Sequence, residues 1–185
     1  MADNVLTHYT SFDAALHILL TGKVKFGNIL NSNDQVEIDL IKDKTEKYLI
    51  FCGCTKPMTS LMWFAYAKNK YGVCISFNLK KGERKRNLFM KNDKSAIKAK
   101  SINYSDKAKK VEVGFTKDKV FKSESEYRYL HIGNNETFFA DINWDIIESI
   151  TLTVSTFFTA SLVESIFKDR IPVDLSVVTE KRFNI

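Results

Sequence analysis

The sequence contains few residues that break regular structure and few that cross-link it. Its 185 residues include two prolines, seven glycines and three cysteines. So few prolines and glycines exclude a long flexible linker, and we expect a single domain over residues 1–185. The cysteines, Cys52, Cys54 and Cys74, are odd in number and lie in apolar segments, which indicates reduced, buried thiols rather than a disulfide framework.

Long apolar runs are also missing. No stretch approaches the roughly 20 consecutive apolar residues that cross a bilayer. The first ten residues contain no basic region followed by an apolar run, so we expect no secretory signal. These absences predict a cytoplasmic protein without a membrane partner.

Several catalytic motifs are absent. The sequence has neither the glycine-rich loop of phosphate-binding folds nor that of dinucleotide-binding folds. It lacks the G-x-S-x-G turn of serine hydrolases and the zinc-deaminase signature. Cys52 and Cys54 have no second pair at zinc spacing, and Asn33, Asp34 and Glu37 suit a helix N-terminus better than a metal. We therefore expect no metal site.

The residues that are present favour an α+β fold with mixed or antiparallel sheets and flanking helices. The chain is 44% hydrophobic and includes 14 Phe and seven Tyr, enough for a substantial core. Helical and strand patterns follow one another without strict alternation. Ser11 and Gly22 are suited to begin and end the first helix. The patterns predict strands at 4–10, 23–26, 47–55, 71–78, 97–104, 125–132, 149–154 and 173–178, and helices at 11–22, 36–44, 60–70 and 158–169.

Positive charge is concentrated in one part of the chain. Residues 80–122 contain 15 Lys or Arg and five Asp or Glu, an excess of ten, although the net charge of the whole chain is +6. Such a segment attracts phosphate backbones and predicts a nucleic-acid partner. A solubilising surface is the alternative.

Glu124 and Glu126 stand two residues apart in the stretch FKSESEYRY, Phe121–Tyr129. If this stretch is a strand, Lys122, Glu124, Glu126 and Arg128 share one face. That face is either a solvated ladder of charges or the wall of an active cleft, and the local pattern does not decide between them. In a cleft, two carboxylates suit chemistry at a glycosidic bond.

Two further segments contain candidate binding residues. His8 follows Thr7 near the end of the first strand, where its ring suits either a ligand hydroxyl or the backbone. Trp63 and Tyr66 share one face of the predicted helix at 60–70. Such aromatic residues either belong to the core or form a wall that stacks on a flat ring.

Taken in order, several motifs resemble those of a large bacterial family of unknown function. They are HYTS at residue 8, ND..E at 33, LMWFAYA at 61, GVCISF at 72 and ESEYR at 124. That family is in turn similar to ADP-ribosyltransferases, particularly bacterial toxins that modify nucleic acid. His8, Tyr66 and Glu126 match the early histidine, middle aromatic and late glutamate of those enzymes.

The resemblance implies an ADP-ribosyltransferase-like fold, NAD as cosubstrate, and a role for each matching residue. Glu126 would bind the ribose and stabilise its developing charge, and Glu124 would orient or deprotonate the acceptor. The remaining candidates are NAD-binding residues: His8 and Thr10 for the adenosine side, Tyr66 and Trp63 for nicotinamide, and Arg128 for the carboxylates or the diphosphate.

The leading hypothesis is therefore mono-ADP-ribosyl transfer to a macromolecule such as nucleic acid, in a toxin, phage or defence context. One alternative is a non-catalytic nucleotide or nucleic-acid binding module that retains the NAD-type cleft. Another is hydrolysis of an N-glycosidic bond. The transferase hypothesis predicts that Glu126→Ala abolishes nicotinamide release and leaves thermal stability almost unchanged.

Overall fold

The computed structural model describes residues 5–56, 60–67, 72–79, 88–89, 97–105, 112–153 and 174–178. The predicted helix at 158–169 and about half of the basic segment, residues 80–87, 90–96 and 106–111, lie outside these residues. Among the described residues, no helix is long and apolar enough to cross a membrane.

The described strands form one nine-stranded sheet and a small two-stranded sheet. Most pairs are antiparallel, and β10–β11 and β6–β7 are parallel. The predicted α+β class with mixed sheets is therefore confirmed. The strands are β1 Val5–Ser11, β2 Lys23–Asn28, β3 Lys47–Cys54, β4 Gly72–Asn78, β5 Ile97–Ser101, β6 Asn103–Tyr104, β7 Thr116–Lys117, β8 Glu126–Gly133, β9 Phe138–Asp141, β10 Ile147–Thr153 and β11 Asp174–Val178.

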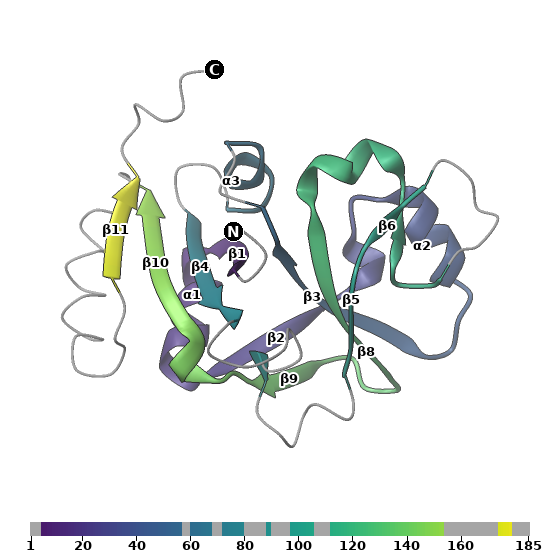
Figure 1. The fold of residues 1–185 in the computed structure, drawn as a ribbon. Helices are drawn as coiled ribbons and strands as arrows, with labels where there is room; N and C mark the ends of the chain where they lie inside the picture. The colour runs from purple at the N-terminus through teal and green to yellow at the C-terminus, as the bar shows by residue number, and fades with distance from the viewer. Residues whose placement is uncertain are drawn as a thin grey trace.

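The large sheet divides at β1 and β3 (Figure 1). On one side, β1 pairs with β4 along its whole length, and β10 and β11 continue this half. On the other side, β3 pairs with β8 along its whole length, and β5 follows. A single residue pair, Thr7 opposite Cys54, joins β1 to β3. The two halves therefore meet at one point.

The described helices follow the sequence patterns closely. Helix α1, Phe12–Thr21, begins after Ser11, which accepts a hydrogen bond from the Ala14 backbone, and ends at Gly22 in the left-handed region with φ 68°. Both predicted end residues are thus confirmed. Helices α2, Gln35–Ile41, and α3, Ser60–Tyr66, are also present where the pattern predicts helix. The 3₁₀ helices are η1 Ile29–Asn31, η7 Lys119–Glu124 and η8 Trp144–Ile146.

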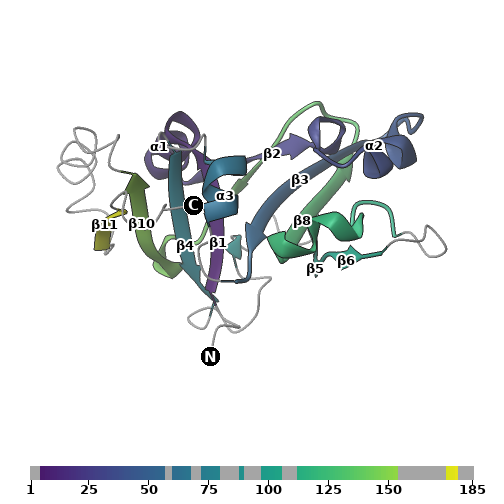
Figure 2. The ribbon, with the colours of Figure 1, turned by 90° about the horizontal axis from the view of Figure 1, so that it is seen from above.

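The helices lie at different parts of the sheet. Viewed from above, α1 and α3 lie beside β1 and β4, whereas α2 lies beyond the N-terminal end of β3 (Figure 2). Phenylalanines fill much of the main core: Phe26, Phe51 and Phe89 contact one another with ring centroids 5.6–6.1 Å apart. The core thus fixes β2 and β3, which carry part of the site.

Candidate active site

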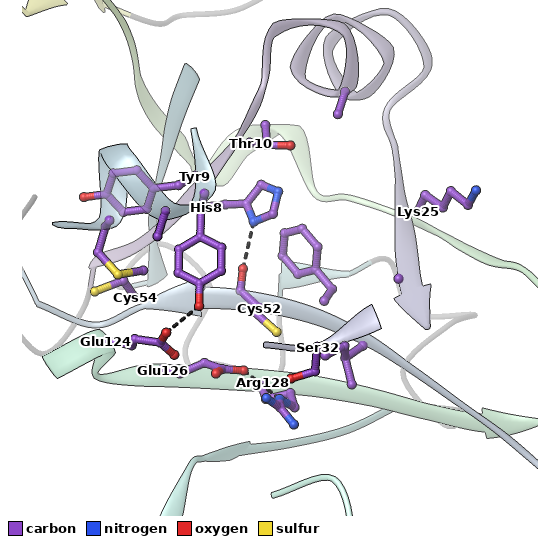
Figure 3. A pocket seen from close by; sticks show the side chains of 18 of the residues that line it. His8, Tyr9, Thr10, Lys25, Ser32, Cys52, Cys54, Glu124, Glu126 and Arg128 are labelled. Carbon is purple, nitrogen blue, oxygen red and sulfur yellow. Dashed lines mark hydrogen bonds and ion pairs between the residues drawn. The ribbon is translucent and has the colours of Figure 1, made fainter. Parts of the chain in front are cut away.

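A cavity of about 790 Å³ is lined by β1 and β3 near the point where they meet. Residues 7–10 of β1 and 50–54 of β3 form two of its walls. Residues of α1, β2, η1, α3, β7, η7, β8 and β9 contribute the rest of the lining, together with the loop residues Ser32 and Asn33. Figure 3 shows His8, Cys52, Glu124 and Glu126 together around this cavity. Its volume lies in the range of about 300–1,000 Å³ that is typical of small-molecule sites.

Glu124 and Glu126 both line the cavity, but they do not belong to one strand. Lys119–Glu124 forms a 3₁₀ helix, Ser125 adopts the left-handed region with φ 47° and ψ 45°, and the strand begins at Glu126. The predicted strand at 125–132 is confirmed by β8 to within one residue at each end, whereas the hypothesis that the whole stretch 121–129 is one strand does not hold for residues 121–125. Its solvated-face alternative is also wrong, because Glu124 and Glu126 are only 6% and 7% exposed.

Two buried cations hold the carboxylates. Lys117 Nζ lies 2.6 Å from Glu124 Oε2 and 3.4 Å from Glu126 Oε2. Arg128 Nε donates to Glu126 Oε1 over 2.6 Å. Burial acts to raise the pKa of Glu126, but the charges of Arg128 and Lys117 outweigh it and hold that pKa below its usual value. Glu126 is consequently ionised at neutral pH.

Arg128 is itself fully enclosed and extends the cluster to α2. It donates to Glu37 of that helix and, over 3.0 Å, to the carbonyl oxygen of Gly114. The prediction that Asn33, Asp34 and Glu37 suit a helix N-terminus holds for Asp34 but not for the Glu37 side chain. Asp34 accepts hydrogen bonds from the backbone N–H groups of Val36 and Glu37, whereas the Glu37 side chain points inward to Arg128. The cluster thus contains three carboxyl groups, Glu37, Glu124 and Glu126, and two cations.

Tyr66 reaches the same cluster from α3, and Trp63 does not. The Tyr66 hydroxyl donates to Glu124 and accepts a 2.8 Å hydrogen bond from Asn33 Nδ2. Burial and the bond to Glu124 raise the pKa of Tyr66, so its hydroxyl stays protonated. Trp63 is 3% exposed, lies outside the cavity lining and packs edge-on against Tyr9.

His8 faces the cavity from β1 as a neutral ring. Its Nδ1 lies 2.7 Å from the Cys52 carbonyl oxygen, which only accepts, so Nδ1 carries the proton. Burial lowers the pKa of His8 from its usual 6.5 to about 4, although the bond to Cys52 acts in the opposite direction. Nε2 is then a hydrogen-bond acceptor. The ring also packs on Phe51, with centroids 4.3 Å apart.

Six of the seven residues predicted for the site line the cavity: His8, Thr10, Tyr66, Glu124, Glu126 and Arg128. Sequence reasoning missed Lys117, the bridge between the two carboxylates, because it is one of many lysines in a basic segment. Glu37 was missed as a charge partner because its position in a helix N-terminus already explained it. No local pattern marks Lys117, because its burial and its two carboxylate partners arise from tertiary contacts.

The burial of Glu126 changes one expectation. Replacing it by alanine would leave Arg128 and Lys117 with unbalanced buried charge. Breaking a buried ion pair in this way costs about 3–5 kcal/mol of folding free energy. We therefore no longer expect Glu126→Ala to leave thermal stability unchanged. Glu126→Gln removes the same charge but keeps the side-chain volume and an oxygen acceptor, so it is the milder probe of chemistry, and its folding is checked by thermal melts.

The fold and the site together define an α+β protein with a largely apolar cavity that contains Glu124 and Glu126 at one part of its wall. Residues 62–113 match a family described as a protein of unknown function (DUF2971). Over these residues the comparison bears out the resemblance to a family of unknown function. The match includes Trp63, Tyr66 and the G-V-C-I-S-F strand.

A solved structure of DarT from Thermus sp. 2.9, in complex with NAD+, is similar to this chain. The two are 12% identical, the similarity covers 95% of this chain and 96% of DarT, and the TM-score is 0.46. No curated protein matches the chain.

Proposed function

We propose that this protein is a mono-ADP-ribosyltransferase that uses NAD and modifies a macromolecular acceptor. One observation carries the proposal: Glu126 is a buried, ionised carboxylate in the wall of a cavity that also contains a neutral histidine. The order of the sequence motifs around His8, Tyr66 and Glu126 supports the same assignment.

Glu126 is suited to stabilise positive charge on a sugar. Bound NAD would supply a ribose whose bond to nicotinamide breaks with the electron pair leaving on nicotinamide, so that positive charge develops on the ribose. Arg128 and Lys117 already fix the Glu126 carboxylate, so little reorganisation accompanies this change. Lone pairs not used by these contacts remain on its oxygens for a ribose hydroxyl.

Glu124 is suited to handle the acceptor. Its two oxygens contact Tyr66 and Lys117, which orient the carboxylate at the cavity wall. In this role Glu124 accepts the proton of the attacking hydroxyl or amine while a bond forms from that group to the ribose carbon. Lys117 contacts Glu124 and Glu126 alike and lowers the cost of holding two carboxylates together.

The remaining lining residues suit the binding of a dinucleotide. His8 Nε2 accepts a hydrogen bond from a ribose hydroxyl, and the Thr10 hydroxyl lies on the same strand. Tyr66 contributes an aromatic wall for nicotinamide. The excess of one carboxyl group over the cations suits the positive ring of NAD.

The acceptor is proposed to be a nucleic acid. The excess of ten positive charges in residues 80–122 supports this choice, because such a segment attracts a phosphate backbone. We also propose a toxin, phage or defence role, which the resemblance of the sequence motifs to those of nucleic-acid-modifying toxins implies.

A second candidate is a binding module without turnover. One observation favours it: both carboxylate oxygens of Glu124 already have hydrogen-bond partners within the protein. Such a module would bind NAD and leave its glycosidic bond intact, and calorimetry combined with analysis of the recovered NAD separates it from an enzyme.

Transfer of label tests the proposal. The protein is incubated with NAD labelled in the adenine ring and a mixed cell lysate, and the nucleic-acid and protein fractions are then separated. We expect label in the nucleic-acid fraction that nuclease releases, and none with Glu126→Gln. Label that remains entirely in NAD, or transfer that is equal in the variant, would contradict the proposal.

A further inference from the structure

Three exposed side chains at one end of the cavity have no part in the chemistry above. His17 of α1, Lys25 of β2 and Phe139 of β9 all line the cavity and come from three different elements. Figure 3 places Lys25 at the opposite end of the view from Glu124 and Cys54. The cavity therefore extends from the carboxylate cluster to a second group of polar and aromatic residues, which we call the mouth.

The mouth residues are held side by side. Lys25 and Phe139 are direct partners in the antiparallel pairing of β2 with β9, so their side chains project to the same face of the sheet. The rings of His17 and Phe139 have centroids 5.8 Å apart and planes inclined by 39°. A cation and two rings thus form one surface.

Charge distinguishes Lys25 from its neighbour. Lys23, two residues earlier on the same face of β2, pairs with Asp141 at 3.6 Å. Within the described residues, no carboxylate pairs with Lys25 in this way. Phe139 is 43% exposed although it is large and apolar. An unpaired cation beside an exposed aromatic ring suits a ligand that has both an anionic group and a flat ring.

We propose that the mouth binds a nucleoside 5′-diphosphate, with Lys25 at the phosphates and the base against Phe139 and His17. This group is either the adenosine diphosphate half of the dinucleotide or a separate nucleotide. The proposal does not require transfer of ADP-ribose, because binding at the mouth involves neither Glu126 nor Glu124. It assigns the adenosine side to these residues rather than to His8 and Thr10 alone.

Gly27 offers a way to narrow the cavity next to the mouth. It lines the cavity on β2, on the same face as Lys25. A Cβ atom added at Gly27 would meet no atom closer than the Ile50 carbonyl oxygen at 3.9 Å. The Cβ atom of Gly27→Val therefore fits without a backbone clash, its two methyl groups take up space beside Lys25, and valine suits a strand.

The test measures the binding of ADP, AMP, adenosine and NAD by calorimetry at low salt. We expect Lys25→Gln to weaken ADP binding about tenfold, the usual effect of losing one charged hydrogen bond, and to leave adenosine almost unaffected. Phe139→Ala weakens both about fivefold or more through lost stacking. Lys23→Gln is the matched control and leaves every affinity unchanged. Thermal melts establish that each variant is folded.

Two further measurements decide whether the ligand of the mouth is one half of the dinucleotide or a separate nucleotide. If ADP displaces NAD, and Gly27→Val weakens NAD more than ADP, the mouth binds one half of the dinucleotide. If ADP and NAD bind together, the mouth binds a separate nucleotide. Equal ADP affinities in the wild type, Lys25→Gln and Lys23→Gln would overturn the inference, as would no ADP binding at millimolar concentration. Absence of nicotinamide release together with Lys25-dependent ADP binding would reject the proposed function alone.

Discussion

Glu126 is buried and remains charged, and the residues around it explain how. Its carboxylate contacts Arg128 from the same strand and Lys117 from a separate one. Arg128 in turn contacts Glu37 of α2. Each charged group of the cluster is therefore paired with a group of opposite charge, which is the condition under which a protein interior tolerates ions.

His8 provides a prediction at the residue scale. The unfolded chain binds a proton on this ring near pH 6.5, whereas the folded protein does so only near pH 4. Acid therefore favours unfolding across this interval, and the stability that a neutral His8 allows is lost as the pH falls from 6.5 towards 4. We expect His8→Gln to show a smaller loss of unfolding free energy between pH 7 and pH 5 than the wild type.

Denaturant titrations at both pH values measure this effect. His17→Gln is the control, because His17 is exposed on α1. This variant measures what the removal of an exposed histidine does to stability at each pH. Identical pH dependence in His8→Gln and the wild type would show that folding does not change the pKa of the ring, which would contradict its burial.

Individual site residues were predictable only where a motif contains them. His8, Tyr66 and Glu126 stand in short motifs with a recognisable order. Lys117 has no such motif, since its role comes from the packing of η7 and β8 around it. Local sequence predicts which residue types are present, and tertiary contacts determine which of them share a site.

At the scale of elements, the turn at Ser125 brings the two carboxylates together. Ser125 N–H donates to the Lys122 carbonyl, and the Ser125 carbonyl accepts two 3.0 Å hydrogen bonds from Thr55. A left-handed residue other than glycine is uncommon and costs about 1 kcal/mol or more. Here it turns the chain from η7 into β8, so that Glu124 and Glu126 both meet Lys117.

We predict that one substitution at Ser125 is tolerated and that another is destabilising. Ser125→Gly accepts the left-handed conformation, and its stability and activity should stay close to those of the wild type. Ser125→Val is strained there by its branched side chain and should lose about 1–3 kcal/mol of unfolding free energy together with most activity. Chemical denaturation and nicotinamide release measure the two effects. Equal behaviour of the two variants would contradict a role for this turn.

The elements themselves were largely predictable, with one instructive failure. Helix α1 was predicted because Ser11 and Gly22 mark its ends and apolar residues recur at helical spacing. The stretch before Glu126 was not, because alternating polar residues are equally compatible with a strand and with a 3₁₀ helix followed by a left-handed turn. Only the bonds from Thr55, 70 residues away in sequence, distinguish the two.

At the scale of the molecule, the cavity results from the way the sheet divides. β1 and β3 share a single residue pair, and each then follows its own partner, β4 or β8. His8, Tyr66 and Glu126 come together there from β1, α3 and β8, which are remote in sequence. The pattern of strands and helices in the sequence predicted the class of fold. The division of the sheet depends on pairing between strands that are remote in sequence. The position of the cavity therefore could not be predicted from any local stretch of the sequence.

Nicotinamide release from NAD is the most direct test of the central claim, that Glu126 in this cavity cleaves the bond between ribose and nicotinamide. The initial rate is compared for the wild type, Glu126→Gln and Glu148→Gln, a surface carboxylate on β10 outside the cavity lining. Removing a preorganised charge that the transition state needs lowers the rate about 10²–10³-fold. We predict that loss for Glu126→Gln, with Glu148→Gln equal to the wild type. A folded Glu126→Gln protein that releases nicotinamide at the wild-type rate would contradict the account.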